Sequence, residues 1–277
     1  ISNDNYFEWR FGNIYYTKKG TGSPILLIHD TLPGASGYEW NKIEDELAID
    51  HTVYTVDLLG CGRSDKSSIT YTNFVYVQMI SDFIKKIIGQ KTDVITSGFS
   101  GSFVTMACHN EKELFNKIML VNPPSLTQLK QMPNRKDRLL KAALEIPIFG
   151  TLVYHMIVSR DNINNLFIEK MYYNPFHVDN QMSDAYYEAA HKGGYYTRFL
   201  YSSLAAKYIN INICHALKAL DNSIYIVEGE TEPNGKAVTD DYCASNPAIE
   251  VSVLKETKHL PHVEAPEAFL EQVKIFF

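Results

Sequence analysis

Short runs of apolar and β-branched residues recur along the first half of the chain and again near its end. They have the length of strands, and consecutive apolar positions are typical of strands buried on both faces of a parallel sheet. The runs lie at 24–28, 52–56, 94–96, 117–121, 223–227 and 249–254. Ahead of them, aromatic and polar residues alternate on both sides of Gly12-Asn13, which predicts an antiparallel hairpin.

Between these runs, apolar residues recur at helical spacing. This periodicity predicts helices over 38–49, from Val77 to a stop at Gly89, from Phe103 onward, and from Pro266 to the end of the chain. Strands that alternate with helices predict a parallel sheet joined by right-handed crossovers.

The pattern changes between residues 125 and 220. No buried strand is recognisable there, helical patterns are broken by proline and glycine, and tyrosine and phenylalanine are frequent. We expect a helical cap over 125–220, inserted into a core domain formed by 1–124 and 221–277. The cap aromatics could line an apolar substrate pocket, although packing within a helical layer accounts for most of them.

Charge and cysteine content narrow the functional classes. The formal net charge of -6, from 26 basic and 32 acidic residues, argues against nucleic acid as a main partner. The four cysteines form no C-x-x-C pair, so we expect free thiols, no metal site and a reducing, cytoplasmic location. No apolar run is long enough to span a bilayer. The chain begins at Ile1, so a membrane anchor ahead of it would not be visible, and the oligomeric state is not predicted.

A candidate nucleophile lies where a strand passes into a helix. The strand 94–96 leads into Gly98-Phe99-Ser100-Gly101-Ser102, and a helix follows. Small neighbours let the backbone turn tightly, and a helix N-terminus favours negative charge beside the serine. The arrangement predicts a nucleophile elbow with Ser100 at its apex, although Ser102 stands where G-x-S-x-G has its last glycine.

A serine nucleophile needs a base and an acid that orients the base. His259 and Glu232 each follow a predicted strand, at the end of the sheet where open parallel sheets bind ligands. The order serine, acid, histidine is one of those known for this geometry. His262 is a rival base, and the rival acids are Glu228, Glu230, Asp240 and Asp241.

Taken together, these motifs resemble the α/β-hydrolase superfamily, and most closely its esterase-like members with a helical cap. The motifs are His29, residues 57–65, the elbow, residues 229–233 and residues 259–264. The resemblance implies an α/β fold with a mostly parallel eight-stranded sheet flanked by helices. It also implies that Ser100, His259 and Glu232 are the nucleophile, base and acid.

The same resemblance assigns the oxyanion hole to the backbone N–H groups of Thr31 and Gly101. The family usually has glycine directly after the histidine that matches His29, whereas Asp30 follows it here. A carboxylate at this position opposes a developing oxyanion unless it points away. His29 is expected to structure its loop, and Asp57, Gly60 and Gly62 are expected to form a structural turn below the site.

The implied function is a serine hydrolase that cleaves a small to medium, apolar carboxylic ester through an acyl-enzyme on Ser100. No cofactor or metal is implied, and the partner is the small-molecule ester. Serine at position 100 disfavours the epoxide-hydrolase and dehalogenase branches, which use an aspartate. Two alternatives stay open: a lyase or cofactor-free peroxidase that uses the same triad, and a catalytically silent binding protein, which Asp30 and Ser102 keep open.

Overall fold

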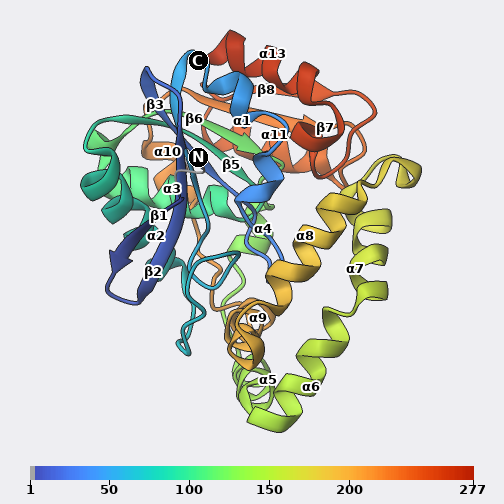
Figure 1. The fold of residues 1–277 in the computed structure, drawn as a ribbon. Coiled ribbons are helices and arrows are strands. Elements are labelled where there is room, and N and C mark those ends of the chain that lie inside the picture. The colour runs from blue at the N-terminus through green and yellow to red at the C-terminus, as the bar shows by residue number, and fades with distance from the viewer. Residues whose placement is uncertain (1–3) are drawn as a thin grey trace.

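One eight-stranded sheet runs through the computed structural model, which describes residues 4–277 (Figure 1). Its strands follow the spatial order β1-β2-β4-β3-β5-β6-β7-β8, in which β2 is antiparallel to β1 and β4 and all later pairs are parallel. The strands are β1 (Asp4–Trp9), β2 (Gly12–Lys19), β3 (Ser23–Ile28), β4 (His51–Val56), β5 (Thr92–Ser97), β6 (Phe115–Val121), β7 (Ile224–Gly229) and β8 (Glu250–Leu254). The predicted fold class is confirmed. Residues 1–3, which the predicted core range 1–124 includes, lie outside the described residues.

The central strands are buried because both of their faces are covered by helices. Leu26 and Ile28 of β3 belong to one hydrophobic cluster, and Ile25 and Leu27 belong to a second cluster on the other face. The first face is covered by α2 (Asn73–Phe83), α3 (Ser100–Asn110), α10 (Cys214–Ala219) and α11 (Gly235–Ser245), and the second by α1 (Glu44–Leu47) and α13 (Pro266–Phe276). The side chains of a strand alternate between faces, so this run of apolar residues fills both clusters.

Short helical turns complete these layers. They are Gly37–Trp40, Ile84–Ile88, Lys112–Leu114, Phe167–Met171, Pro175–His177, Gly194–Thr197 and α12 (Pro261–Glu264). The helix predicted over 38–49 is divided into the first of these turns and the four-residue α1. Trp40, Ile43 and Leu47 are nevertheless all buried, so the apolar spacing identified the core-facing residues without specifying one continuous helix.

Between β6 and β7 the chain is helical. Its helices are α4 (Leu126–Leu129), α5 (Arg135–Glu145), α6 (Pro147–Ile157), α7 (Arg160–Leu166), α8 (Asn180–His191), α9 (Arg198–Ala205) and α10. The helices α5 to α9 extend away from the sheet (Figure 1), and we call them the cap helices. A cluster of their apolar side chains packs against Leu260 and Val263, next to His259. The division into core and cap domains stays a prediction.

The register of the parallel strands places two loops side by side. Ile28 at the end of β3 pairs with Thr96 near the end of β5. Two residues further along each chain come Asp30 and Gly98. The loops after β3 and β5 therefore leave the sheet together, at the carboxyl ends of the strands where parallel sheets bind ligands.

Candidate active site

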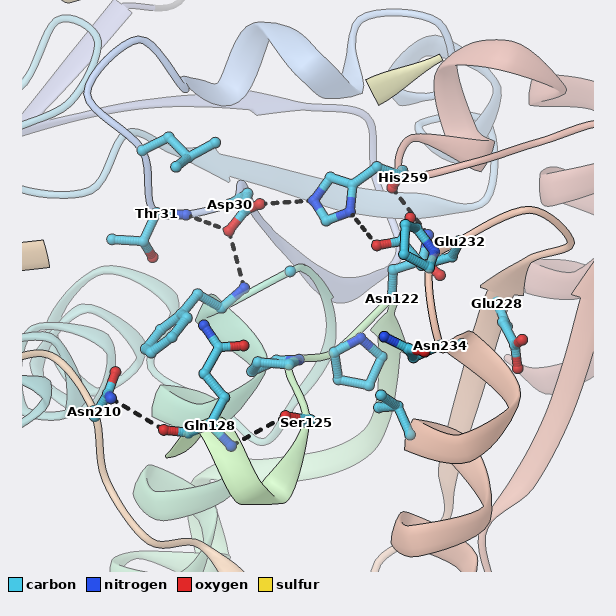
Figure 2. Close-up of a pocket in the computed structure, with 18 of the residues that line it drawn as sticks. Asp30, Thr31, Asn122, Ser125, Gln128, Asn210, Glu228, Glu232, Asn234 and His259 are labelled. Atoms are coloured by element: carbon cyan, nitrogen blue, oxygen red, sulfur yellow. Dashed lines mark hydrogen bonds and ion pairs between the residues drawn. The ribbon is translucent and has the colours of Figure 1, made fainter. Parts of the chain in front are cut away.

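The His259 imidazole lies between two carboxylates (Figure 2). Its Nδ1 is 3.0 Å from Glu232 Oε1, and its Nε2 is 2.9 Å from Asp30 Oδ2. Because ionised carboxylates only accept hydrogen bonds, both ring nitrogens donate and the ring is a cation. Burial alone would lower the pKa of His259, but the hydrogen bonds and charges of Asp30 and Glu232 outweigh it. The pKa of His259 therefore lies well above its ordinary value of 6.5.

The second oxygen of Asp30 is held by the backbone. Oδ1 accepts hydrogen bonds from the N–H of Thr31 at 2.7 Å and from the N–H of Phe99 at 2.9 Å. Burial alone would raise the pKa of Asp30, but the hydrogen bond and charge of His259 and these two N–H groups lower it overall. Two backbone N–H groups converging on one oxygen form the geometry of an oxyanion hole. Here the Asp30 carboxylate fills it.

Gly98 explains why the carboxylate fits there. It follows β5 directly, has a φ of 56°, and turns the chain toward α3. A Cβ atom at this position would lie 2.3 Å from both Cγ and Oδ2 of Asp30. The turn that follows the strand therefore has no side chain at its apex, and the Asp30 carboxylate occupies the space into which such a side chain would project.

Ser100 has different partners from those expected of a nucleophile. It is the first residue of α3 and is fully buried. Its hydroxyl donates to the His29 carbonyl at 2.5 Å and lies 3.0 Å from Thr31 Oγ1. The N–H of Gly101 donates to the Gly98 carbonyl at 3.2 Å, within the turn that opens the helix. The structure thus brings Glu232, His259 and the Thr31 N–H together, but it does not bring Ser100 or Gly101 to His259.

The rival base pairs with Glu39, whose other carboxylate oxygen accepts the backbone N–H of Asp30 at 3.4 Å. Nε2 of His262 lies 3.2 Å from Glu39 Oε1, and its ring stacks on Trp40 with the ring centroids 4.2 Å apart. Its position is fully buried. This second histidine–carboxylate pair lies in the hydrophobic layer under the site and resembles the Glu232–His259 pair in composition.

Three of the four rival acids have partners elsewhere, and the fourth, Asp241, is exposed on α11. Glu228 accepts a hydrogen bond from Thr239 Oγ1 at 3.0 Å, and Glu230 accepts one from the N–H of Glu256 at 2.9 Å. Asp240 pairs with Lys236 in the next turn of α11. Glu232 is the acidic residue of this region that contacts His259.

Asn122 holds the loops of the site together, and the sequence analysis missed it. It follows β6 with a φ of 43°, which asparagine tolerates better than most residues. Its side-chain amide donates to the carbonyls of Lys258 at 2.8 Å and His259 at 3.0 Å, and its oxygen accepts the N–H of Gly229 at 3.0 Å. The available signal was an asparagine between a buried strand and two prolines.

His29 fixes the loop that carries Asp30. Its Nε2 accepts the N–H of Leu58 at 2.9 Å, so Nδ1 carries the proton and donates to the Asp30 carbonyl at 2.6 Å. Asp57 accepts the N–H groups of Gly37 and Arg63 at 2.6 and 2.8 Å. The His29 bonds tie the loop that carries Asp30 to the loop after β4, and the Asp57 bonds join that second loop to Gly37.

The carboxylate pair opens into a pocket of about 500 Å³ (Figure 2). Asp30, Glu232 and His259 line one side of it, while Gln128 and Asn210 line the side away from His259. A separate, more apolar pocket of about 400 Å³ lies between the cap helices and Leu32. Across residues 4–277 no group of three or more histidine, cysteine, aspartate or glutamate side chains is arranged to hold a metal ion.

Comparisons with known proteins agree with this architecture. A family model described as "Alpha/beta hydrolase family" matches residues 25–272. An uncharacterized protein of Mycobacterium tuberculosis is 28% identical over 109 residues, which cover 39% of this chain and 31% of that protein. The 2-hydroxy-6-oxo-6-(2'-aminophenyl)hexa-2,4-dienoic acid hydrolase of Metapseudomonas resinovorans is 29% identical over 113 residues, 40% of this chain and 39% of that one. The matches thus span well under half of these relatives' own length.

Solved structures extend the likeness to the whole chain. A serine hydrolase involved in carbazole degradation superposes with a TM-score of 0.80 at 17% identity, covering 100% of this chain and 98% of that one. An epoxide hydrolase superposes with a TM-score of 0.81 at 15% identity, covering 100% and 99%. These likenesses confirm the fold, and the family model confirms the family resemblance seen in the sequence motifs.

Proposed function

The chain belongs to the alpha/beta hydrolase family, and on that premise we propose that it hydrolyses a small molecule through a covalent ester formed on the Asp30 carboxylate. One observation carries the proposal: this carboxylate lies between His259 and two backbone N–H groups, beside the glycine that follows β5. A nucleophile of this fold needs contact with the histidine and with the oxyanion hole. Asp30 has both contacts.

The geometry favours a saturated carbon as the electrophile. Oδ1 of Asp30 already takes the N–H groups of Thr31 and Phe99, so the carbonyl oxygen of an ester substrate finds no free oxyanion hole. Attack on a saturated carbon needs no such hole. The substrate class is therefore a molecule with a strained or good leaving group on carbon, of which an epoxide is the simplest example.

In the first step, Oδ2 of Asp30 forms a bond to the epoxide carbon while the ring C–O bond breaks. The electron pair of that bond stays on the ring oxygen, which takes the proton from Nε2 of His259. This proton lies next to the attacking oxygen, because Nε2 and Oδ2 are 2.9 Å apart. The products are an alcohol esterified to Asp30 and a neutral imidazole.

In the second step, the same residues hydrolyse the ester. Esterified Asp30 has lost its charge, which lowers the proton affinity of His259, and Nε2 becomes the base that deprotonates water. The water oxygen attacks Cγ of Asp30, and the negative charge that develops on Oδ1 is stabilised by the N–H groups of Thr31 and Phe99. The ester C–O bond then breaks, the alkoxide takes the Nε2 proton, and the new carboxylic acid returns its proton to His259.

The more specific prediction from the sequence, ester hydrolysis through an acyl-enzyme on Ser100, is the competing mechanism. The motif around Ser100 supports it, but its hydroxyl bonds to His29 and Thr31 in place of His259. Solved structures of similar fold include both carboxylesterases and an epoxide hydrolase, so the fold alone does not choose between the two nucleophiles.

Hydrolysis in water enriched in heavy oxygen tests the proposal. p-Nitrostyrene oxide is turned over many times, the protein is digested, and the peptide that contains Asp30 is weighed. We expect heavy oxygen in the Asp30 carboxylate of the wild type and of S100A, and none in D30N. Turnover that leaves Asp30 unlabelled would contradict the proposal. So would a protein that hydrolyses p-nitrophenyl acetate but not the epoxide and is labelled at Ser100 by a fluorophosphonate.

A further inference from the structure

Exposed apolar side chains gather on two neighbouring cap helices, at the end of the molecule farthest from the sheet (Figure 1). On α6, Ile148, Leu152 and Met156 are spaced four residues apart, so they share one face of the helix. Ile148 is 78% exposed and Leu152 is 62% exposed. We call the exposed apolar side chains of α5, α6 and the junction between them the α5–α6 surface; its members are Leu139, Leu140, Ile146, Ile148, Phe149, Leu152 and Met156.

Such a surface is unusual for a side that faces water. Large contiguous apolar patches on a folded protein generally mark an interaction site. No single helix within residues 4–277 has the length and composition of a membrane span. The helices α5 and α6 have that length and composition only when taken together, and the pair is bent by 96°. The pair therefore presents an apolar edge with a sharp bend, of the kind that lies in the plane of an interface.

The start of α5, at the end of that helix away from α6, carries exposed positive charge. Arg135, Lys136 and Arg138 at the start of α5 are all exposed. The two acidic residues of α5 are engaged, since Asp137 pairs with Lys207 and Glu145 pairs with Lys141. The exposed charge of α5 is thus basic, although the whole chain has a net charge of -6.

From this combination we infer that the α5–α6 surface docks on an anionic phospholipid bilayer. Ile148, Phe149 and Leu152 enter the boundary between headgroups and acyl chains, and the basic residues of α5 contact the phosphates. A second copy of the chain fits less well. A two-fold interface would bring the same basic helix against itself, whereas anionic headgroups complement it.

The docked face leads toward the candidate active site. Ile157 and Val158, at the end of α6, line the apolar pocket of about 400 Å³ together with Leu32 and Leu204. Leu32 and Leu204 also line the pocket that contains Asp30 and His259. The two pockets are therefore neighbours, and the apolar one begins at the end of the helix that the bilayer would contact. This arrangement suits an apolar substrate whichever residue is the nucleophile.

Vesicle flotation of the full chain tests the inference. We expect the wild type to float with vesicles of phosphatidylcholine and phosphatidylglycerol, to stay behind with phosphatidylcholine alone, and to float less at high salt because charge is screened. The I148S/L152S variant should lose at least about tenfold in partitioning, and R135E/K136E should also lose binding. The matched control is I49S/I275S, whose side chains are 65% and 73% exposed away from the α5–α6 surface; it should float like the wild type.

A fluorescence measurement gives an independent readout. Both native tryptophans, Trp9 and Trp40, are buried, so the F149W variant adds an indole that reports on this surface. Its emission should shift to the blue with anionic vesicles. Flotation that is equally strong in I148S/L152S would overturn the inference. So would a wild type that does not bind vesicles but forms a dimer, if the I148S/L152S variant is monomeric. Hydrolysis of a water-soluble substrate should be unchanged in I148S/L152S, which separates this test from that of the proposed function.

Discussion

The neighbouring loops after β3 and β5 both differ from the pattern that is usual in the family, and the two differences are complementary. The loop after β5 retains a sharp turn with a positive φ and a helix directly behind it, but Gly98 at its apex has no side chain. The loop after β3 retains the N–H of Thr31, but it has Asp30 at the position where the family usually has glycine. Because the parallel register places Asp30 opposite Gly98, the loss in one loop makes room for the gain in the other.

The position of a nucleophile in this fold is defined by the space beside the histidine. Either strand end can fill that space, since neighbouring parallel strands end at the same edge of the sheet. The chain segment that supplies the group is therefore less constrained than the position of the group itself.

The largest expected effect comes from replacing each of the two candidate nucleophiles in turn. D30N should lower turnover of an epoxide probe by about a thousandfold or more, because the amide is not a nucleophile. S100A should change turnover by less than about tenfold, since the hydroxyl contacts His29 and Thr31 only. The measurement is kcat with both proteins at equal folded concentration. The opposite ranking of the two variants would return the nucleophile to Ser100.

The next effect compares the two histidine–glutamate pairs. E232Q should slow turnover on the order of a hundredfold, because the amide no longer fixes the His259 proton and tautomer. E39Q changes the matching pair on His262 and should cost stability. Its remaining amide oxygen can still accept the N–H of Asp30, so turnover should stay within a few fold of the wild type. Steady-state kinetics and thermal melting of both variants separate the two roles. Equal losses of turnover in the two variants would contradict a catalytic role that is specific to the Glu232–His259 pair.

A smaller effect concerns the space at Gly98. G98S should reduce the free energy of unfolding by about 2–4 kcal/mol, because its Cβ would lie 2.3 Å from the carboxylate of Asp30 in a positive-φ position. The D30G/G98S variant removes the clash, so the two changes should be coupled by about 1 kcal/mol or more in denaturant unfolding. The double variant should also react with a fluorophosphonate at position 98. Purely additive losses would show that the two loops do not compete for one space.

The smallest effect is on the pH dependence. The raised pKa of His259 contributes stability that is fully present below its unfolded value near 6.5 and is lost as pH rises through the folded value. The lowered pKa of Asp30 contributes stability that is present above 3.8 and is lost as pH falls. The melting temperature should therefore decline at alkaline pH by a few degrees, and less so in D30N. Epoxide turnover should fall over the same alkaline range, whereas a serine mechanism would gain activity as His259 loses its proton.

The sequence predicted the sheet and the contact between Glu232 and His259, but it did not predict Asp30 as the second partner of His259. Local apolar runs predict buried strands, and Glu232 and His259 each follow such a run. The apex of the elbow is different. Gly98 and Ser100 lie two residues apart in a string of small residues, and only the backbone φ distinguishes which one turns the chain.

Long-range pairing explains the remaining misses. Asp30 was noticed as an unusual residue, but its direction depends on the register between β3 and β5, which no local pattern encodes. Asn122 was missed for the same reason, since its amide bonds to residues more than a hundred positions away. Side chains whose role is to join distant loops have no periodic signal.

The two carboxylates around one imidazolium also give the pocket an electrical preference. Asp30 and Glu232 carry two negative charges and His259 carries one positive charge, so the trio has a net charge of minus one before any ligand arrives. A neutral or cationic molecule enters this field without penalty, whereas an anion is repelled at short range. Beside His259, this charge disfavours an acidic compound relative to a neutral one of the same shape.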